Sequence, residues 1–96
     1  MTAVEAPGSL LGRALRLHPR VALRPEPFGA LVYHYDTRRL VFLKHPDVVR
    51  VVEALERHDD VAGALVACDI GAERIPAFER ALSSLLESEM LDDRAG

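Results

Sequence analysis

The sequence is poor in cysteine and in aromatic residues. Its 96 residues include one cysteine, two tyrosines, three phenylalanines and no tryptophan. The single thiol of Cys68 cannot form an intramolecular disulfide, and no Cys/His spacing typical of a zinc site occurs. We therefore expect a protein of the reducing cytosol with no structural metal. The one domain that this length allows must have a largely aliphatic core.

Signals for export and for membrane insertion are also missing. Glu5 precedes every basic residue, and the leucine cluster at residues 10–17 is interrupted by Gly12, Arg13 and Arg16. A signal peptide begins with basic residues, and a membrane span needs about 20 apolar residues in a row. We predict neither of them, and no membrane partner.

The residue patterns of a catalytic site are absent as well. His34, His45 and His58 have no regularly spaced carboxylate or cysteine companions, and no glycine-rich phosphate-binding loop is present. Cys68 lies on the apolar stripe of a predicted helix, where a buried thiol is usually inert. Asp59 and Asp60 suit helix capping better than acid/base catalysis, because adjacent side chains point apart. The sequence therefore predicts no enzymatic activity, no metal and no cofactor.

Charge is divided unevenly along the chain, although the net charge is only −3. Residues 13–44 carry seven basic and two acidic side chains, a balance of +5, whereas residues 45–96 carry five basic and twelve acidic ones, a balance of −7. Two interpretations stay open. The charges form two solvated faces, or the basic front half meets an acidic partner.

Alternating apolar residues predict three strands near the N-terminus. Residues 1–12 mix small residues with Pro7 and Gly8 and are predicted to form a flexible tail. Residues 12–19 have the apolar spacing of a short helix that Pro19 would end. The strands are expected at residues 21–25, 30–35 and 40–44, with Gly29 allowing an unusual backbone angle between the first two.

Three helices are predicted to follow the strands. Pro46 and Asp47 are typical of a first helical turn, so a helix is expected at about residues 46–57. A second helix is expected after an N-cap at Asp59 or Asp60, with Val61, Leu65 and Cys68 on its apolar face and Gly71 at its end. A third opens at Pro76 and places Phe78, Leu82 and Leu85 on one face. Strands followed by helices indicate an α+β domain over residues 13–91, with a second tail at 92–96.

The predicted hairpin of residues 30–44 is apolar on both faces. A four-residue loop at 36–39, in which Asp36 can bond its own backbone and initiate the turn, would pair Tyr33 with Phe42 on one face and Val32 with Leu43 on the other. An antiparallel sheet usually exposes one polar face to water. Either the leucines of residues 11–17 cover the second apolar face, or that face receives a partner. In the second case, the last strand also offers an open edge to a peptide.

The stretch "RLHPRVALRPEPFGALVYHYDTRRLVFLK", residues 16–44, resembles the peptide chaperones of mycofactocin biosynthesis. The order of elements over residues 21–91 is similar to that of a wider family, the leader-binding domains of ribosomally made and later modified peptides, which includes the pyrroloquinoline quinone chaperones. The resemblance implies a winged-helix-like fold of three strands and three helices. It also implies that the leader of a precursor peptide adds as a strand and is presented to a radical S-adenosylmethionine maturase, whose iron–sulfur chemistry this chain does not need.

The resemblance further assigns the peptide site to the third strand and the third helix. The strand residues are Leu40, Val41, Phe42, Leu43 and Lys44. The helix residues are Phe78, Arg80, Ala81, Leu82 and Leu85. The resemblance does not decide which flank of the helix faces the peptide, and Phe78, Leu82 and Leu85 suit the core equally well. The alternative for this fold is a DNA-binding regulator. Its recognition helix should be basic, whereas Glu79 and Glu87 outnumber Arg80 here, so we expect no nucleic-acid partner.

Overall fold

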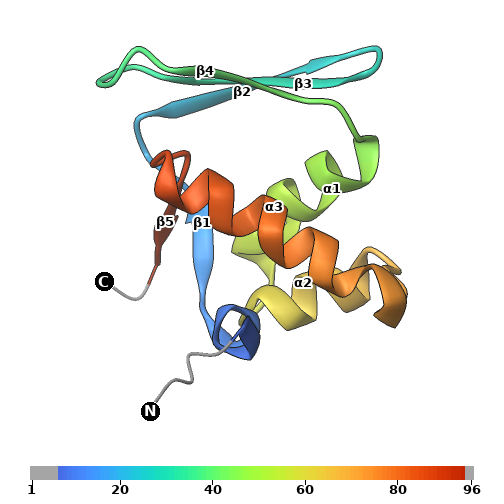
Figure 1. Ribbon diagram of the computed structural model, residues 1–96. Coiled ribbons are helices and arrows are strands. Elements are labelled where there is room, and N and C mark those ends of the chain that lie inside the picture. The colour runs from blue at the N-terminus through green and yellow to red at the C-terminus, as the bar shows by residue number, and fades with distance from the viewer. Residues whose placement is uncertain (1–6, 95–96) are drawn as a thin grey trace.

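The computed structural model describes residues 7–94 and contains a three-stranded antiparallel sheet with helices on one side of it (Figure 1). The strands, in the order of the sheet, are β2 (Val21–Glu26), β3 (Gly29–His34) and β4 (Leu40–Leu43). The α-helices that follow are α1 (Pro46–Ala54), α2 (Val61–Ala67) and α3 (Ile75–Glu87). Single 3-10 turns, η2 (Leu55–Arg57) and η3 (Ala72–Arg74), lie between them. This order confirms the predicted α+β, winged-helix-like class.

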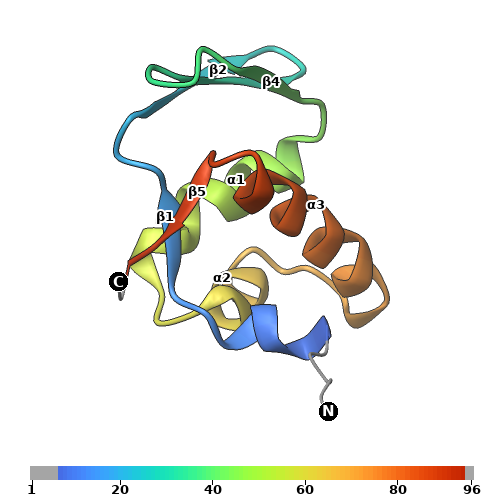
Figure 2. The same ribbon diagram turned by 60° about the vertical axis from the view of Figure 1, so that its left-hand side comes forward.

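A second, two-stranded sheet joins the two ends of the described chain (Figure 2). It consists of β1 (Leu15–Leu17) and β5 (Leu91–Asp93), which run antiparallel. Arg16 lies opposite Asp92 and forms an ion pair of 3.1 Å with it, and Arg13 and Asp93 form another of 2.6 Å. The helix predicted at residues 12–19 is therefore wrong, because pairing with β5, more than 70 residues away, favours a strand over the local pattern.

The predicted tails also differ from the structure where it describes them. Residues 7–12 form a 3-10 helix, η1 (Pro7–Gly12), in which Leu10 is buried. Residues 92 and 93 belong to β5, and Arg94 donates a backbone hydrogen bond to the carbonyl of Ala14. Residues 1–6 and 95–96 lie outside the described residues. The folded unit is thus longer at both ends than residues 13–91.

The helix starts follow their local signals. Pro46 and Pro76 lie in the first turns of α1 and α3, where a missing N–H removes no hydrogen bond. Asp60 is the N-cap of α2, and its Oδ1 accepts a 2.8 Å hydrogen bond from the backbone N–H of Gly63. The end of α2 was placed wrongly at Gly71. The turn to positive φ falls at Asp69 (φ 64°), because an aspartate tolerates the left-handed conformation and can end the helix earlier.

The four-residue loop of the β3–β4 hairpin lies one residue earlier in the sequence than predicted, at residues 35–38. Val32 pairs with Val41 and Tyr33 with Leu40, so Tyr33 does not lie opposite Phe42. The turn closes between His34 and Arg39, with Arg38 at positive φ (67°). Asp36 was expected to initiate the turn, but the side chain of His34 has this role. His34 Nδ1 accepts the N–H groups of Asp36 (3.1 Å) and Thr37 (3.3 Å). The shift moves every pair by two positions, so the two faces keep the predicted side chains.

One aliphatic core fills the space between the sheet and the helices. Its fully buried members come from β1, β3, all three α-helices, η2 and the segment before β5, and include Leu15, Val32, Leu55, Leu65, Leu82 and Met90. His34 is the one buried polar residue among those described. In residues 7–94, no group of three His, Cys, Asp or Glu side chains is arranged to bind a metal, and no helix has the length and apolarity needed to cross a membrane.

No helix or strand of residues 7–94 covers the side of the sheet that faces away from the helices. We call it the outer face, and it carries the side chains of Leu31, Tyr33, Tyr35, Leu40 and Phe42. Figures 1 and 2 show α1 and α3 on the opposite side. Leu15, which was one of the leucines considered as a cover, is buried in the core instead. Of the two interpretations of the second apolar face, coverage by residues 11–17 is therefore wrong.

Candidate functional site

β4 is an edge strand with unpaired backbone groups along one side. Ala30, Val32 and His34 of β3 lie opposite Leu43, Val41 and Arg39, and the N–H of His34 donates to the carbonyl of Arg39 at 3.0 Å. Hydrogen-bonded and non-hydrogen-bonded pairs alternate in an antiparallel ladder. It follows that Val41 and Leu43 bond to β3, whereas Leu40 and Phe42 direct their N–H and C=O groups to the open edge.

The other edge of the sheet, β2, is less suited to receive a strand. The N–H of Tyr35 donates to the carbonyl of Arg20 at 2.8 Å, so the residues of β2 that bond to β3 are those two and four positions further on. Pro25 falls on the alternate set, which faces outward, and has no N–H to donate. Proline on an edge strand blocks strand addition. β4 is therefore the edge at which a peptide can extend this sheet.

α3 runs beside the open edge of β4, below the plane of the sheet (Figures 1 and 2). One small hollow contains Thr37 and Arg39, just before β4, together with Glu87 and Ser88 at the end of α3. A larger hollow contains His45, just after β4, together with Ala77 and other residues at the start of α3. The two hollows lie at opposite ends of β4 and of α3, so strand and helix run in opposite directions between them, and we call the two hollows together the groove.

The larger hollow, of about 450 Å³, is the apolar part of this groove. Its walls are formed by Val48 of α1 and by Ala77, Phe78 and Ala81 of α3, with His45, Glu73 and Arg74 at the rim. The guanidinium carbon of Arg74 lies 5.1 Å from the centre of the Phe78 ring, within the range of a cation–π contact. A hollow of this size and lining suits an apolar side chain of an extended peptide.

Asp47 forms an ion pair with Arg74, the cation at the rim of the hollow. Its carboxylate forms ion pairs with Arg50 (2.8 Å) and with Arg74 (2.9 Å), the residue that lies over Phe78. The hydrogen bond from Arg50 and then that from Arg74 lower the pKa of the Asp47 carboxyl. The carboxylate therefore stays ionised at neutral pH and fixes the arginine at the rim.

The structure places the sequence-predicted site residues in three environments: the exposed surface of the sheet, the groove and the core. Leu40 (61% exposed), Phe42 (44%) and Lys44 lie at the surface, while Leu43 (8%) is buried. Val41 is half-buried and faces the core side of the sheet. On α3, Phe78 and Ala81 line the hollow and Arg80 is exposed, whereas Leu82 and Leu85 belong to the core.

Five residues of the larger hollow were not predicted: His45, Val48, Glu73, Arg74 and Ala77. Val48 and Ala77 are half-buried or exposed apolar residues near helix starts, a position that has no signal in a single sequence. The i, i+4 spacing of Ala77 and Ala81 places them on one flank of α3. That spacing continues the apolar face formed by the core positions 78, 82 and 85, but the pattern does not show that this flank borders a hollow.

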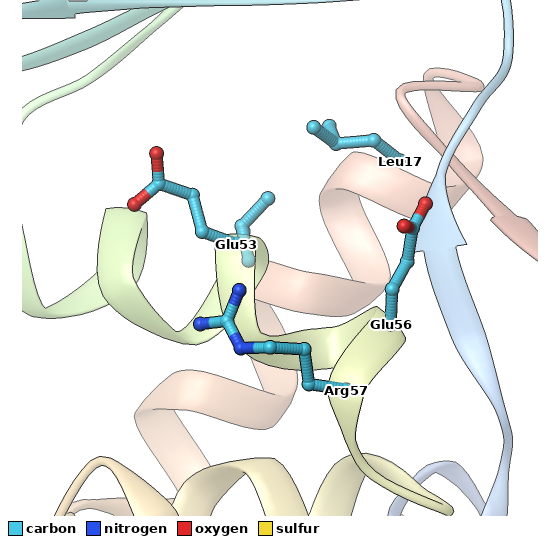
Figure 3. A pocket seen from close by; sticks show the side chains of 5 residues that line it. Leu17, Glu53, Glu56 and Arg57 are labelled. Carbon is cyan, nitrogen blue, oxygen red and sulfur yellow. The ribbon is translucent and has the colours of Figure 1, made fainter.

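Another hollow of about 420 Å³ lies between β1 and α1, away from the β4 edge (Figure 3). Leu17 lies on one side of it, and Glu53, Glu56 and Arg57 project around it. Three of the five residues that line it are charged, and Leu17 and Val52 are the apolar ones. It is therefore less suited to the apolar side chains of a peptide than the hollow around Phe78 and Ala81.

The sequence that forms this site matches a known protein family. The family model for the peptide chaperone MftB family matches residues 14–92. The chain belongs to the peptide chaperone MftB family. Proteins named peptide chaperone MftB from Mycolicibacterium smegmatis, Mycobacterium ulcerans and Mycobacterium tuberculosis are 49%, 47% and 44% identical to it. These alignments cover 79%, 82% and 85% of this chain and 74%, 72% and 75% of the relatives. No solved structure matches the chain.

The region that matches the MftB family model contains the β4 edge and the groove. Residues 14–92 contain β4, α1 and α3 in full, together with most of the small sheet of β1 and β5. The family name therefore applies to the whole candidate site and not to a fragment of the fold.

Proposed function

We propose that this protein is a non-catalytic peptide chaperone, which binds the leader of a ribosomally made precursor peptide and presents it to a radical S-adenosylmethionine maturase in mycofactocin biosynthesis. The leader forms a fourth strand beside β4, with its side chains in the groove against α3. The family supports the peptide chaperone role. The pathway and the maturase follow from the resemblance of residues 16–44.

The open edge of β4 is the observation that carries this proposal. Leu40 and Phe42 present their N–H and C=O groups outward, whereas the opposite edge of the sheet contains Pro25. Extended peptides bind sheet edges of this kind through main-chain hydrogen bonds, and pockets beside the edge select their side chains. The hollow around Phe78 and Ala81 is such a pocket.

Main-chain bonding alone does not explain stable binding. Ordering five leader residues costs roughly 5 to 10 kcal/mol of backbone entropy, whereas four hydrogen bonds at the β4 edge return about 1 kcal/mol each. Micromolar affinity corresponds to about −8 kcal/mol. Each apolar side chain that is buried contributes roughly 1.5 to 3 kcal/mol. The leader must therefore insert several apolar side chains into the groove.

The proposed role requires no chemistry from this chain. The iron–sulfur and S-adenosylmethionine chemistry belongs to the maturase, and the chaperone contributes binding and orientation. We assign it no cofactor and no nucleic-acid partner. A cytoplasmic location is compatible with its single free thiol, Cys68, which is buried.

Amide hydrogen exchange with and without the purified precursor peptide tests the proposal. We expect slower exchange at Leu40 and Phe42, whose N–H groups become hydrogen-bonded, and in α3, which the peptide covers. Exchange in β2 should change little. Protection confined to β2, or to the hollow beside Leu17, would place the peptide on another surface and contradict the proposed site.

A calorimetric titration with the precursor peptide, repeated in the presence of the maturase, tests the partners. We expect one peptide per chain and a ternary complex. Turnover of the peptide by this protein alone, or stoichiometric iron or zinc in the purified chain, would contradict the non-catalytic role.

A further inference from the structure

The outer face of the sheet carries three of the five large hydrophobic side chains that are exposed among the described residues. Large hydrophobic side chains that are exposed there are Leu40 (61%), Tyr35 (53%) and Phe42 (44%), and Phe28 (77%) lies at the adjoining β2–β3 turn. Val66 of α2 is the remaining exposed one among residues 7–94. Apolar surface that is gathered in one patch, and not scattered, marks interaction sites on soluble proteins.

The centre of the outer face is shaped as well as apolar. A hollow of about 390 Å³ lies over it, lined by side chains of all three strands: Ala22, Arg24, Leu31, Tyr33, Tyr35 and Leu40. The rings of Tyr33 and Tyr35 meet edge to face, with centroids 5.4 Å apart and planes at 80°. This packing fixes two aromatic side chains that no helix covers. Ordered, exposed aromatic residues are typical of protein-binding surfaces.

The rim of the outer face is basic. Residues 20–44 contain five basic and two acidic side chains, a balance of +3, within a chain of net charge −3. Arg20 pairs with Asp36 and Arg24 with Glu26, both at the exposed surface. Arg38 and Lys44 are exposed and form no ion pair with the described residues. The surface therefore complements an apolar patch that is bordered by carboxylates.

The proposed peptide site leaves this face free. A peptide strand that pairs with β4 lies in the plane of the sheet, and the hollow beside it is lined by α3, which lies on the opposite side of the sheet from the outer face (Figure 2). Alternate side chains of the added strand point to the outer face and so extend it. A partner that contacts the outer face therefore touches the chaperone and one side of its bound peptide together.

A second copy of this chain fits the face poorly. Three strands that are about 4.8 Å apart and six residues long present roughly 300 Å² in projection, less than half of the roughly 800 Å² per partner of a standard stable interface. A symmetric dimer would also bring the two basic rims together. The small area suits a transient complex with any partner, and the basic rim favours a different protein with complementary charge over a second copy.

We propose that the outer face of the sheet is the docking surface for the maturase, which contributes an apolar patch bordered by carboxylates. This inference rests on the proposed function, because it assigns the maturase a surface separate from that of the peptide. The separation explains how the chain can hold both partners at once.

The variant Leu31→Thr with Tyr33→Thr tests the docking surface. Both residues lie in the central strand, so the substitution keeps the β4 edge intact, and threonine keeps a high strand propensity. We expect the affinity for the purified maturase to fall at least about tenfold, with the affinity for the precursor peptide alone unchanged within about twofold. Val66→Thr, which removes a more exposed apolar side chain from α2, should change neither affinity.

The outcomes separate the inference from the function on which it rests. If the double variant binds the maturase as tightly as the wild type does, the docking surface is wrong and the proposed function still stands. A wild-type chain that binds peptide but no maturase would overturn both the docking surface and the presentation role. Loss of peptide binding in the double variant would assign the outer face to the peptide. If the wild type self-associates and the double variant does not, the outer face binds a second copy of this chain. The last two results also overturn the inference. Circular dichroism confirms that each variant is folded.

Discussion

Gly29, the first residue of β3, lies directly against the backbone carbonyl of Leu43, the last residue of β4. A Cβ atom at position 29 would overlap this carbonyl oxygen, and the φ angle of Gly29 is +154°, which other residues rarely adopt. The glycine thus fixes the end of β4, where the strand meets the apolar hollow. It is the point at which the hairpin sets the geometry of the groove.

Replacing this glycine should destabilise the protein. Gly29→Ala is expected to lower the free energy of unfolding by roughly 1 to 3 kcal/mol, because the backbone must move and adopt a strained angle. Urea denaturation measures the change. Gly12→Ala is the matched control, since no atom lies within 4 Å of the added methyl group, and it should be close to neutral. Equal stability of the two variants would contradict the close approach.

Proline at position 42 should abolish peptide binding without unfolding the sheet. The N–H of Phe42 points to the open edge, so Phe42→Pro removes a donor for the peptide and no bond to β3. Pro25 already occupies the equivalent outward position in β2. We expect an affinity for the precursor peptide at least about tenfold weaker by calorimetry. Phe42→Ala, which keeps the N–H, should retain more of the binding. The edge pairing is wrong if the two variants bind alike.

Two neighbouring positions of α3 should separate stability from binding. Leu82 is fully buried, so Leu82→Ala should cost roughly 2 to 5 kcal/mol of stability. Ala81 lines the hollow and is half-buried, so Ala81→Glu should leave the fold intact and weaken peptide binding by blocking the hollow. Thermal unfolding and peptide titration of both variants measure the two effects. Normal peptide affinity in the folded Ala81 variant would exclude this hollow from the site.

The ion pairs of Asp47 should make stability depend on pH. Because Arg50 and Arg74 lower its pKa in the folded state, Asp47 stabilises the fold fully above the ordinary aspartate value of about 3.9. That contribution is lost as the pH falls toward the folded-state pKa. Asp47→Asn should therefore lower stability at pH 7, and the difference from the wild type should narrow below about pH 4. A difference that stays constant with pH would contradict the linkage. Glu53→Gln, at an exposed residue without an ion pair in the described chain, is the control.

The sequence predicts those elements whose signals are local. The starts of the helices at Pro46, Asp60 and Pro76 follow from capping and from the tolerance of proline in a first turn. The two-residue period of a strand predicts which hairpin side chains point to the core and which point outward. The pairing register could not be predicted, because the imidazole of His34 closes the turn one position earlier than a turn initiated by Asp36 would.

Elements that depend on distant partners could not be predicted in this way. β1 and β5 are three residues each and become strands through their pairing across most of the chain. The candidate site shows the same division. β4 was assigned by resemblance, but the flank of α3 that borders the groove depends on how the helix packs on Val48 and the sheet. A single helix pattern shows an apolar face without showing where that face ends.

Arg94 provides the last test, at a position where the sequence predicted only a tail. Its guanidinium donates to four backbone carbonyls at the end of η2: those of Leu55 (3.1 Å), Glu56 (2.8 Å), His58 (2.7 Å) and Asp59 (3.2 Å). Carbonyls at a helix end have no partner within the helix, and a planar guanidinium can bond several of them at once, which a lysine ammonium cannot. Arg94→Lys should therefore lower the free energy of unfolding by roughly 1 to 3 kcal/mol in urea. Arg80→Lys, at an exposed arginine of α3 without an ion pair among the described residues, should be neutral. If both variants unfold at the same urea concentration as the wild type, the contacts of Arg94 do not stabilise the fold, and the folded unit ends before it.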